Sequence, residues 1–164
     1  MHPVNALVLA DTHMPSRART FPETVIAALR QADLILHAGD LATLAVLQEL
    51  ESYAPVFAVS GNVDAPEVVS RLPRRLIVPV GTFQIGLIHG HGATGSTLER
   101  AAAAFARDAV DCVVFGHSHQ PLLARRDGRL FLNPGSPTDK RGQPGYSFAW
   151  LRAGEALEPE IVYF

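Results

Sequence analysis

The chain has 164 residues, of which 48% are hydrophobic, and it carries a formal net charge of −2 at pH 7. This length is typical of one domain with a substantial core, so we expect residues 1–164 to form a single domain. The mild acidity argues against the basic surface that binds duplex nucleic acid or an anionic membrane. Neither a membrane-spanning segment nor a signal peptide is predicted, and the single cysteine, Cys112, lies in an apolar run. We therefore expect a cytoplasmic protein with a reduced thiol.

In the first half of the chain, predicted strands alternate with predicted helices. Apolar runs at residues 4–10, 34–36 and 56–59 are typical of buried strands. Between them, apolar residues at helical spacing predict helices over residues 22–31 and about 41–50. This alternation predicts an α/β domain with a largely parallel central sheet.

The second half is richer in antiparallel strands. Two β-type runs, at residues 76–80 and 82–88, flank Gly81 and predict a hairpin. An alanine-rich helix is predicted from about residue 96 to 107. The remaining predicted strands cover residues 112–115, 122–125, 129–132, 146–151 and 161–164. We expect these strands to form a second sheet that packs on the first.

Oxygen and nitrogen donors recur where the apolar runs end. The set comprises Asp11, His13, Asp40, Asn62, His89, His117 and His119. Seven such donors exceed what one tetrahedral ion needs and suit two ions that share a bridging carboxylate. A structural alternative exists for several of them, because Asp11 and Asp40 could cap the following helices and Asn62 could belong to a turn. We expect His37 to orient a ligand rather than to bind metal.

The order of these residues resembles the calcineurin-like metallophosphoesterases. The matching motifs are Asp11-Thr12-His13, Gly39-Asp40, Gly61-Asn62, His89-Gly90 and Gly116-His117-Ser118-His119. The short chain and Asn133-Pro134-Gly135-Ser136 are similar to the small bacterial and archaeal phosphodiesterase branch, which is related to a retromer subunit.

The resemblance implies an αββα two-sheet sandwich, in which mixed sheets flanked by helices hold two divalent ions (Mn, Fe or Zn, with Mn favoured). By this resemblance, Asp11, His13 and His119 would bind one ion. Asn62, His89 and His117 would bind the other, and Asp40 would bridge the two. The implied activity is hydrolysis of a small phosphate ester, in particular a diester, by in-line attack of a hydroxide that bridges the ions. The oligomeric state stays open, with a homo-oligomer among the alternatives.

One position departs from the wider family, in which many members carry a histidine directly after the motif asparagine to protonate the leaving group. Here that residue is Val63, which cannot transfer a proton. We hypothesise that His91 is the substitute acid, since it lies two residues beyond His89 in a glycine-flanked turn. Loop arginines are candidates for contact with the substrate phosphate, namely Arg17, Arg19 and Arg141.

Two other functions remain open at this stage. Residues 90–95 satisfy G-x-G-x-x-G, which is typical of a dinucleotide-binding oxidoreductase. The next strand, however, ends in Gly116-His117 rather than in an acidic ribose partner. The other alternative is a metal-poor protein-interaction scaffold, as in the retromer subunit of the same superfamily. Loss of ligands would indicate a scaffold, and all seven candidate ligands are present here.

Overall fold

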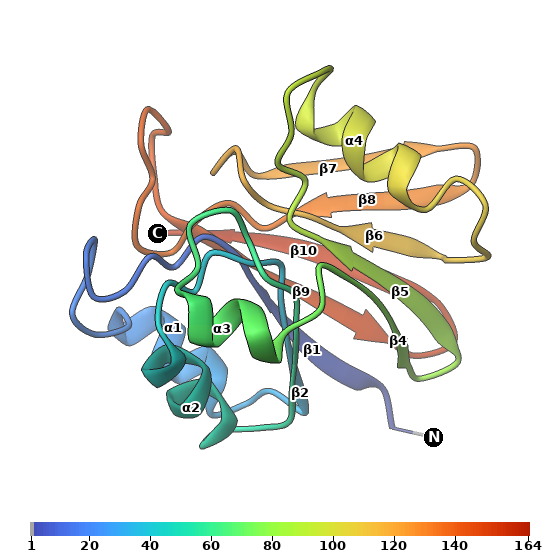
Figure 1. Ribbon diagram of the computed structural model, residues 1–164. Helices are drawn as coiled ribbons and strands as arrows, with labels where there is room; N and C mark the ends of the chain where they lie inside the picture. Colours follow the sequence, from blue (N-terminus) through green and yellow to red (C-terminus); the bar gives the residue numbers. More distant parts are fainter. Residues whose placement is uncertain (1) are drawn as a thin grey trace.

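Two five-stranded sheets pack face to face in the computed structural model, which describes residues 2–164 (Figure 1). The first sheet contains, in spatial order, β10 (Leu157–Tyr163), β9 (Ser147–Ala153), β1 (Val4–Leu9), β2 (Leu34–His37) and β3 (Val56–Ala58). The second contains β4 (Arg75–Val80), β5 (Phe83–Ile88), β6 (Cys112–Val114), β8 (Arg129–Asn133) and β7 (Leu122–Arg126). Both sheets are mixed, because β1–β2–β3 and β5–β6–β8 pair in parallel and the remaining neighbours pair antiparallel.

Helices cover the outer face of each sheet (Figure 1). The first sheet is covered by α1 (Glu23–Leu29), α2 (Leu44–Glu51) and α3 (Pro66–Arg71), and the second by α4 (Thr97–Ala104). Side chains alternate across β1, so that Val8 packs between the sheets whereas Leu7 packs against the helices. A third apolar cluster, around Phe105 and Val113, joins α4 to the second sheet. The predicted αββα sandwich is confirmed.

The last two strands join the first sheet, so the prediction that they belong to the second sheet was wrong. β9 runs antiparallel to β1, with Val4 opposite Ala153 and Val8 opposite Ala149. The alternation of apolar and polar residues in β9 specifies which side chains point into the core, but not which strand β9 pairs with. β2 occupies only one side of β1, so the other side is available to β9. β10 also begins at Leu157, four residues before its predicted start, because Pro159 interrupts the pattern and is tolerated at the sheet edge.

Two differences from the predicted helices affect the loops near strand ends. α2 begins at Leu44 rather than near residue 41, since Asp40 (φ 59°) and Ala42 (φ 86°) adopt left-handed backbone that a right-handed helix cannot contain. The residue that precedes α2 is Thr43, and the one that precedes α1 is Pro22, so neither Asp40 nor Asp11 caps a helix. The short helix α3 was not predicted, because six residues give too little periodicity.

None of the helices within residues 2–164 combines the length and the apolar character needed to span a membrane.

Substitution of Gly86 by alanine should destabilise the second sheet. A Cβ atom at this position in β5 would lie 2.8 Å from Cε1 of Phe105, which is fully buried against the sheet. Because the aromatic ring cannot move without disturbing the core, we expect a loss of about 1–3 kcal/mol in the free energy of unfolding, measured in urea. The matched control is Gly142→Ala, where no atom lies within 4 Å of the added Cβ. Equal midpoints for the two variants would contradict the prediction.

Candidate metal centre

The seven predicted donors follow the carboxyl ends of the strands that pair in parallel in both sheets. Asp11 and His13 follow β1, Asp40 follows β2 and Asn62 follows β3. From the second sheet, His89 follows β5, and His117 and His119 follow β6. Parallel strands place their carboxyl ends at one edge, which is where ligands bind in α/β sheets. The two sheets therefore supply their donors to a common region.

Much of this region has strained backbone. Five of the seven candidate ligands have φ between 43° and 69°, namely Asp11, His13, Asp40, His117 and His119. Left-handed backbone in a non-glycine residue costs of order 1–3 kcal/mol and persists only where the surroundings hold it. Gly39 permits a further close approach, because a Cβ atom there would lie 2.8 Å from Nδ1 of His89. Such a concentration of strain is typical of a functional site.

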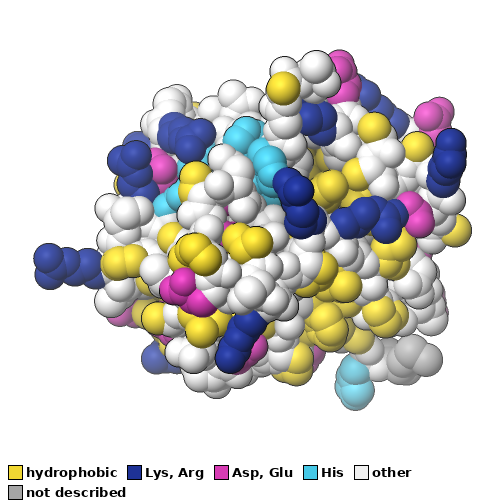
Figure 2. Space-filling model, in the orientation of Figure 1, with side chains coloured by type: hydrophobic (Ala, Val, Ile, Leu, Met, Phe, Trp, Pro, Cys, Tyr) yellow, Lys and Arg dark blue, Asp and Glu magenta, His cyan; other side chains and the backbone are white. Residues whose placement is uncertain are grey.

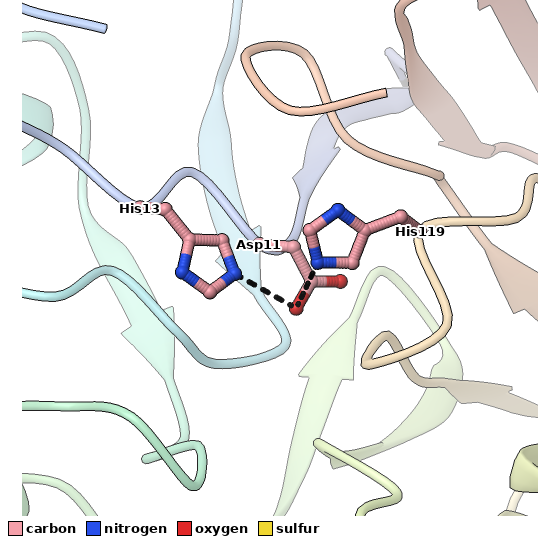
Figure 3. A group of neighbouring side chains, drawn as sticks. All are labelled: Asp11, His13 and His119. Carbon is pink, nitrogen blue, oxygen red and sulfur yellow. Dashed lines mark ion pairs between the residues drawn. The ribbon is translucent and has the colours of Figure 1, made fainter. Parts of the chain in front are cut away.

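Asp11, His13 and His119 form the first group of candidate ligands (Figure 3). Oδ1 of Asp11 lies 3.8 Å from Nε2 of His13 and 3.6 Å from Nε2 of His119. Figure 3 shows both rings directing a nitrogen at this one oxygen. All three atoms are buried, and none has a hydrogen-bond partner within residues 2–164. Since a buried carboxylate oxygen without a partner is costly, this arrangement fits a bound cation.

Asp11, Asp40 and His89 form the second group. Nε2 of His89 lies 3.0 Å from Oδ2 of Asp40 and 3.7 Å from Oδ1 of Asp11. Oδ1 of Asn62 is also 3.0 Å from this nitrogen. Oδ2 of Asp40 lies 3.6 Å from Nε2 of His13, so it reaches both groups, as the predicted bridge requires. Asp11 reaches both groups as well, which the sequence did not indicate.

His117 lies further out than the five buried candidates, and Asn62 is the most exposed of the seven. His117 is half-buried, and its ring centroid is 5.2 Å from that of His89. Its backbone N–H nevertheless contributes to the cluster by donating a 2.9 Å hydrogen bond to Oδ2 of Asp11. Oδ1 of Asp40 likewise accepts a 3.0 Å bond from the backbone N–H of Val63. Each carboxylate thus has one oxygen fixed by the backbone and the other directed at the imidazoles.

Two of the imidazoles are oriented by backbone carbonyls. Nδ1 of His89 donates to the carbonyl oxygen of Ala38 at 2.8 Å, and Nδ1 of His119 donates to that of Asp139 at 2.5 Å. A ring that donates from Nδ1 leaves the lone pair of Nε2 free to bind a metal ion. In both residues Nε2 is the nitrogen that faces the carboxylates.

The electrostatics of the cluster favour positive charge. Burial opposes ionisation of Asp40, but the hydrogen bond from His89 and the charge of that ring lower the pKa of Asp40 to about 2. Burial likewise opposes protonation of His89, whereas the hydrogen bond to Asp40 and the charge of Asp11 raise the pKa of His89. A bound divalent cation would balance the negative charge of the two carboxylates without a proton on His89.

Two further side chains fix the loops that carry the candidate ligands, and the sequence analysis assigned this role to neither. Asp64 accepts backbone hydrogen bonds from Asp40 and Gly61 with Oδ2, at 3.1 and 2.7 Å, and a third from Ala42 with Oδ1 at 2.7 Å. Ser136 donates to the carbonyl oxygen of Asp11 at 2.7 Å. The aspartate two residues after Asn62 was a detectable turn signal, whereas nothing local to Ser136 indicates its partner.

His37 lies between the two loops that carry Asp11 and Asp40, as its predicted orienting role requires. Its Nδ1 accepts a hydrogen bond from the backbone N–H of Gly39 at 3.1 Å, so Nε2 carries the proton and donates to Oγ1 of Thr12 at 3.2 Å. Complete burial lowers the pKa of His37 to about 4. The ring is therefore neutral at physiological pH.

His91 borders the cluster. Its ring centroid lies 5.4 Å from that of His89, and its Nε2 lies 3.1 Å from Nη2 of Arg74. Burial, the charge of His89 and that of Arg74 all lower the pKa of His91. In Figure 2, histidine side chains reach the surface as a group with lysine or arginine side chains beside them.

The three candidate arginines are placed differently. Arg17 and Arg141 both lie near Oδ2 of Asp139, at 3.4 and 3.9 Å, beside the carbonyl that orients His119. Arg19 instead lines a separate hollow with Met14 and Thr43. The structure therefore brings two of the three predicted phosphate contacts to the border of the cluster.

The glycine-rich loop at residues 90–95 is closed rather than open to a dinucleotide. Arg100 fills its concave side by donating to the carbonyl oxygens of Gly90, Thr94 and Gly95 at 2.6–3.0 Å. A capping box between Ser96 and Glu99 occupies the start of α4 and places a carboxylate there. A pyrophosphate needs free N–H groups at this position and would be repelled by the carboxylate. The geometry does not support the oxidoreductase alternative.

The αββα sandwich with buried aspartate and histidine side chains at its strand ends agrees with the predicted metallophosphoesterase class. Residues 4–155 match the calcineurin-like phosphoesterase superfamily domain, and the chain belongs to this family. The predicted family is thereby confirmed. Together, the family and the two groups of candidate ligands support a phosphoesterase that depends on a divalent metal.

Relatives and solved structures agree with this classification. A protein of Methanothermobacter thermautotrophicus described as a probable metallophosphoesterase is 37% identical over 155 residues, which cover 94% of this chain and 90% of the relative. Vps29 of Entamoeba histolytica, solved in complex with Zn²⁺, aligns with TM-score 0.78 and 26% identity over 98% of this chain and 99% of that chain. Vacuolar Protein Sorting 29 of Cryptosporidium parvum aligns with TM-score 0.79 and 23% identity over 100% and 99%, and it shares the fold.

Metal should stabilise this protein through Asp11. We expect Mn²⁺ or Zn²⁺ at 100 times Kd to increase the free energy of unfolding of the wild type by about 2.7 kcal/mol and thereby to raise its thermal midpoint. Asp11→Asn keeps the oxygen that accepts from His117 but removes the charge, so the metal-dependent shift should disappear. Without metal, the variant should be at least as stable as the wild type, because it no longer buries a carboxylate oxygen that lacks a partner. Differential scanning calorimetry with and without chelator measures both quantities. A metal-dependent shift that survives in Asp11→Asn would exclude Asp11 as a ligand.

Proposed function

We propose that the protein is a phosphodiesterase that holds two divalent ions, with manganese favoured, and hydrolyses a small phosphate diester. The observation that carries this proposal is the buried Oδ1 of Asp11, which has no hydrogen-bond partner within residues 2–164 and faces imidazole nitrogens of both candidate groups. Seven oxygen and nitrogen donors are more than one ion needs, and carboxylate, amide and imidazole ligands suit manganese, iron or zinc.

The side chains have distinct roles in this proposal. Ions bound here would activate water for in-line attack and offset the charge that develops on the phosphoryl oxygens. Asp40 would serve both ions, with Asp11, His13 and His119 completing one site. Asn62, His89 and His117 would complete the other. Arg17 and Arg141 border the His119 side of the cluster, where their charge would attract the phosphate of the substrate.

His91 would assist the leaving group. Val63 is 51% exposed and offers no proton, whereas His91 lies beside His89 and His117, at ring centroid separations of 5.4 and 6.2 Å. The lowered pKa of His91 makes its neutral form dominant near neutral pH. The ring would therefore donate a hydrogen bond to the departing oxygen more often than a full proton, which modifies the acid hypothesis drawn from the sequence.

A scaffold that lacks catalysis is the second candidate, and the likeness to Vps29 favours it. One solved Vps29, from Chaetomium thermophilum, is in complex with a cyclic peptide. The converging ligands favour hydrolysis here, because a scaffold has no need for strained backbone at five potential ligands. Assays with bis(p-nitrophenyl) phosphate and p-nitrophenyl phosphate, each with Mn²⁺, Zn²⁺ and Fe²⁺, distinguish the candidates. Hydrolysis of the first substrate indicates a diesterase, hydrolysis of the second a monoesterase, and hydrolysis of neither a scaffold.

Substitution of Asp40 by alanine should abolish nearly all hydrolysis. Loss of a residue that merely supports a ligand costs about 10–100-fold, so loss of a shared ligand should cost at least about 100-fold in kcat. Metal content, measured by elemental analysis of the purified protein, should fall for both ions. Glu155→Ala, at an exposed hairpin position, is the control and should behave as the wild type. A variant that keeps two ions and most of its turnover would refute a shared role for Asp40.

Substitution of His91 by alanine should affect substrates selectively. A diester with an alkoxide leaving group needs help at the departing oxygen, whereas a nitrophenolate does not. We expect kcat to fall by roughly 10²-fold for an alkyl diester and to change little for bis(p-nitrophenyl) phosphate, with metal content unchanged. Equal losses on both substrates would indicate damage to the metal centre or to general substrate binding instead.

A further inference from the structure

Arg74 contacts His91 from a fixed position. It lies between α3 and β4, 17 residues before its partner, and its Nη2 is 3.1 Å from Nε2 of His91. The backbone on each side is anchored, because the carbonyl oxygen of Pro73 accepts a 2.9 Å hydrogen bond from Ser60, and Arg75 begins the ladder of β4. The guanidinium therefore approaches His91 from a rigid segment, although its side chain is exposed.

The chemistry of this contact determines where the neutral imidazole carries its proton. A guanidinium is always charged and has only donors, so Nε2 of His91 must be the acceptor. The proton of the neutral ring must then be on Nδ1. This nitrogen is buried and has no hydrogen-bond partner within residues 2–164. A buried N–H group without a partner is unfavourable, which indicates that a bound molecule supplies the acceptor.

We propose that Arg74 is a positioning residue that holds His91 in the Nδ1–H tautomer, so that the imidazole presents an N–H donor to the phosphate ester beside His89 and His117. This inference rests on the proposed function for its consequence in catalysis, but the tautomer itself is a property of the protein alone. A phosphate ester fits this donor because its oxygens are acceptors only. Without Arg74, the ring could place its proton on Nε2 and would then offer a lone pair that repels those oxygens.

The tautomer can be measured directly by long-range ¹H–¹⁵N NMR of histidine-labelled protein. The full chain is studied both metal-free and loaded with diamagnetic Zn²⁺, at a pH well above the pKa of an imidazole, and the His91 signals are assigned from their absence in His91→Ala. In the wild type, Nδ1 should be protonated and Nε2 should not. Arg74→Gln should produce a population with the proton on Nε2, because the glutamine oxygen can accept a hydrogen bond. Arg71→Gln, which removes the same charge from an exposed position three residues away, should leave the tautomer unchanged.

Kinetics test whether Arg74 acts through His91. Arg74→Gln should lower kcat for an alkyl diester by about 10-fold with little change in KM, and Arg74→Gln combined with His91→Ala should be no slower than His91→Ala alone. A wild-type His91 protonated mainly on Nε2, or an unchanged tautomer in Arg74→Gln, would overturn the inference. Additive losses, or a KM increase on every diester, would also overturn it and assign Arg74 to substrate binding. If the wild type hydrolyses no phosphate ester, the proposed function fails while the NMR experiment still decides the tautomer.

Discussion

The burial of two carboxylates at the ends of β1 and β2 is the constraint on which the rest of the site depends. Asp11 is completely buried and Asp40 nearly so, and one oxygen of each is directed toward imidazole nitrogens rather than toward water. Such charges destabilise a folded protein unless a cation or a set of donors compensates for them. The hydrogen bonds from His117 and Val63 compensate one oxygen of each, and bound metal is the natural compensation for the other.

This requirement also explains how the two sheets cooperate. Asp11 and Asp40 follow strands of the first sheet, whereas His89 and His119 follow strands of the second. Neither sheet contains all of the candidate ligands, so they come together only when the sandwich is assembled. The left-handed backbone at the candidate ligands directs their side chains across the junction between the two sheets. The pairing of the strands offsets the conformational free energy that this backbone costs.

The sequence was sufficient to predict those helices and strands whose pattern of apolar residues is visible within the element itself. Buried parallel strands read as continuous apolar runs, and the polar residues that follow them had to meet at one sheet edge, so the convergence of the candidate ligands was predictable before their geometry. The helix α3 was too short to show a helical period. The sheet assignment of β9 and β10 and the contact of Arg74 were not predictable, because each depends on a partner distant in sequence. Asp64 was detectable as a turn residue, but its bonds to the backbone of Asp40 and Ala42 were not.

The pairing of β1 with β9 has a consequence for how the chain folds during synthesis. Val4 and Ala153 are neighbours in the sheet although almost the whole chain separates them. The central strand therefore lacks one of its two partners until residues Ser147–Ala153 have left the ribosome, and contacts of such high sequence separation form slowly. During that interval β1 exposes an apolar edge of the kind that promotes association between chains. Recognition by chaperones during translation is consequently most relevant for the first strand, which is followed by the candidate ligand Asp11.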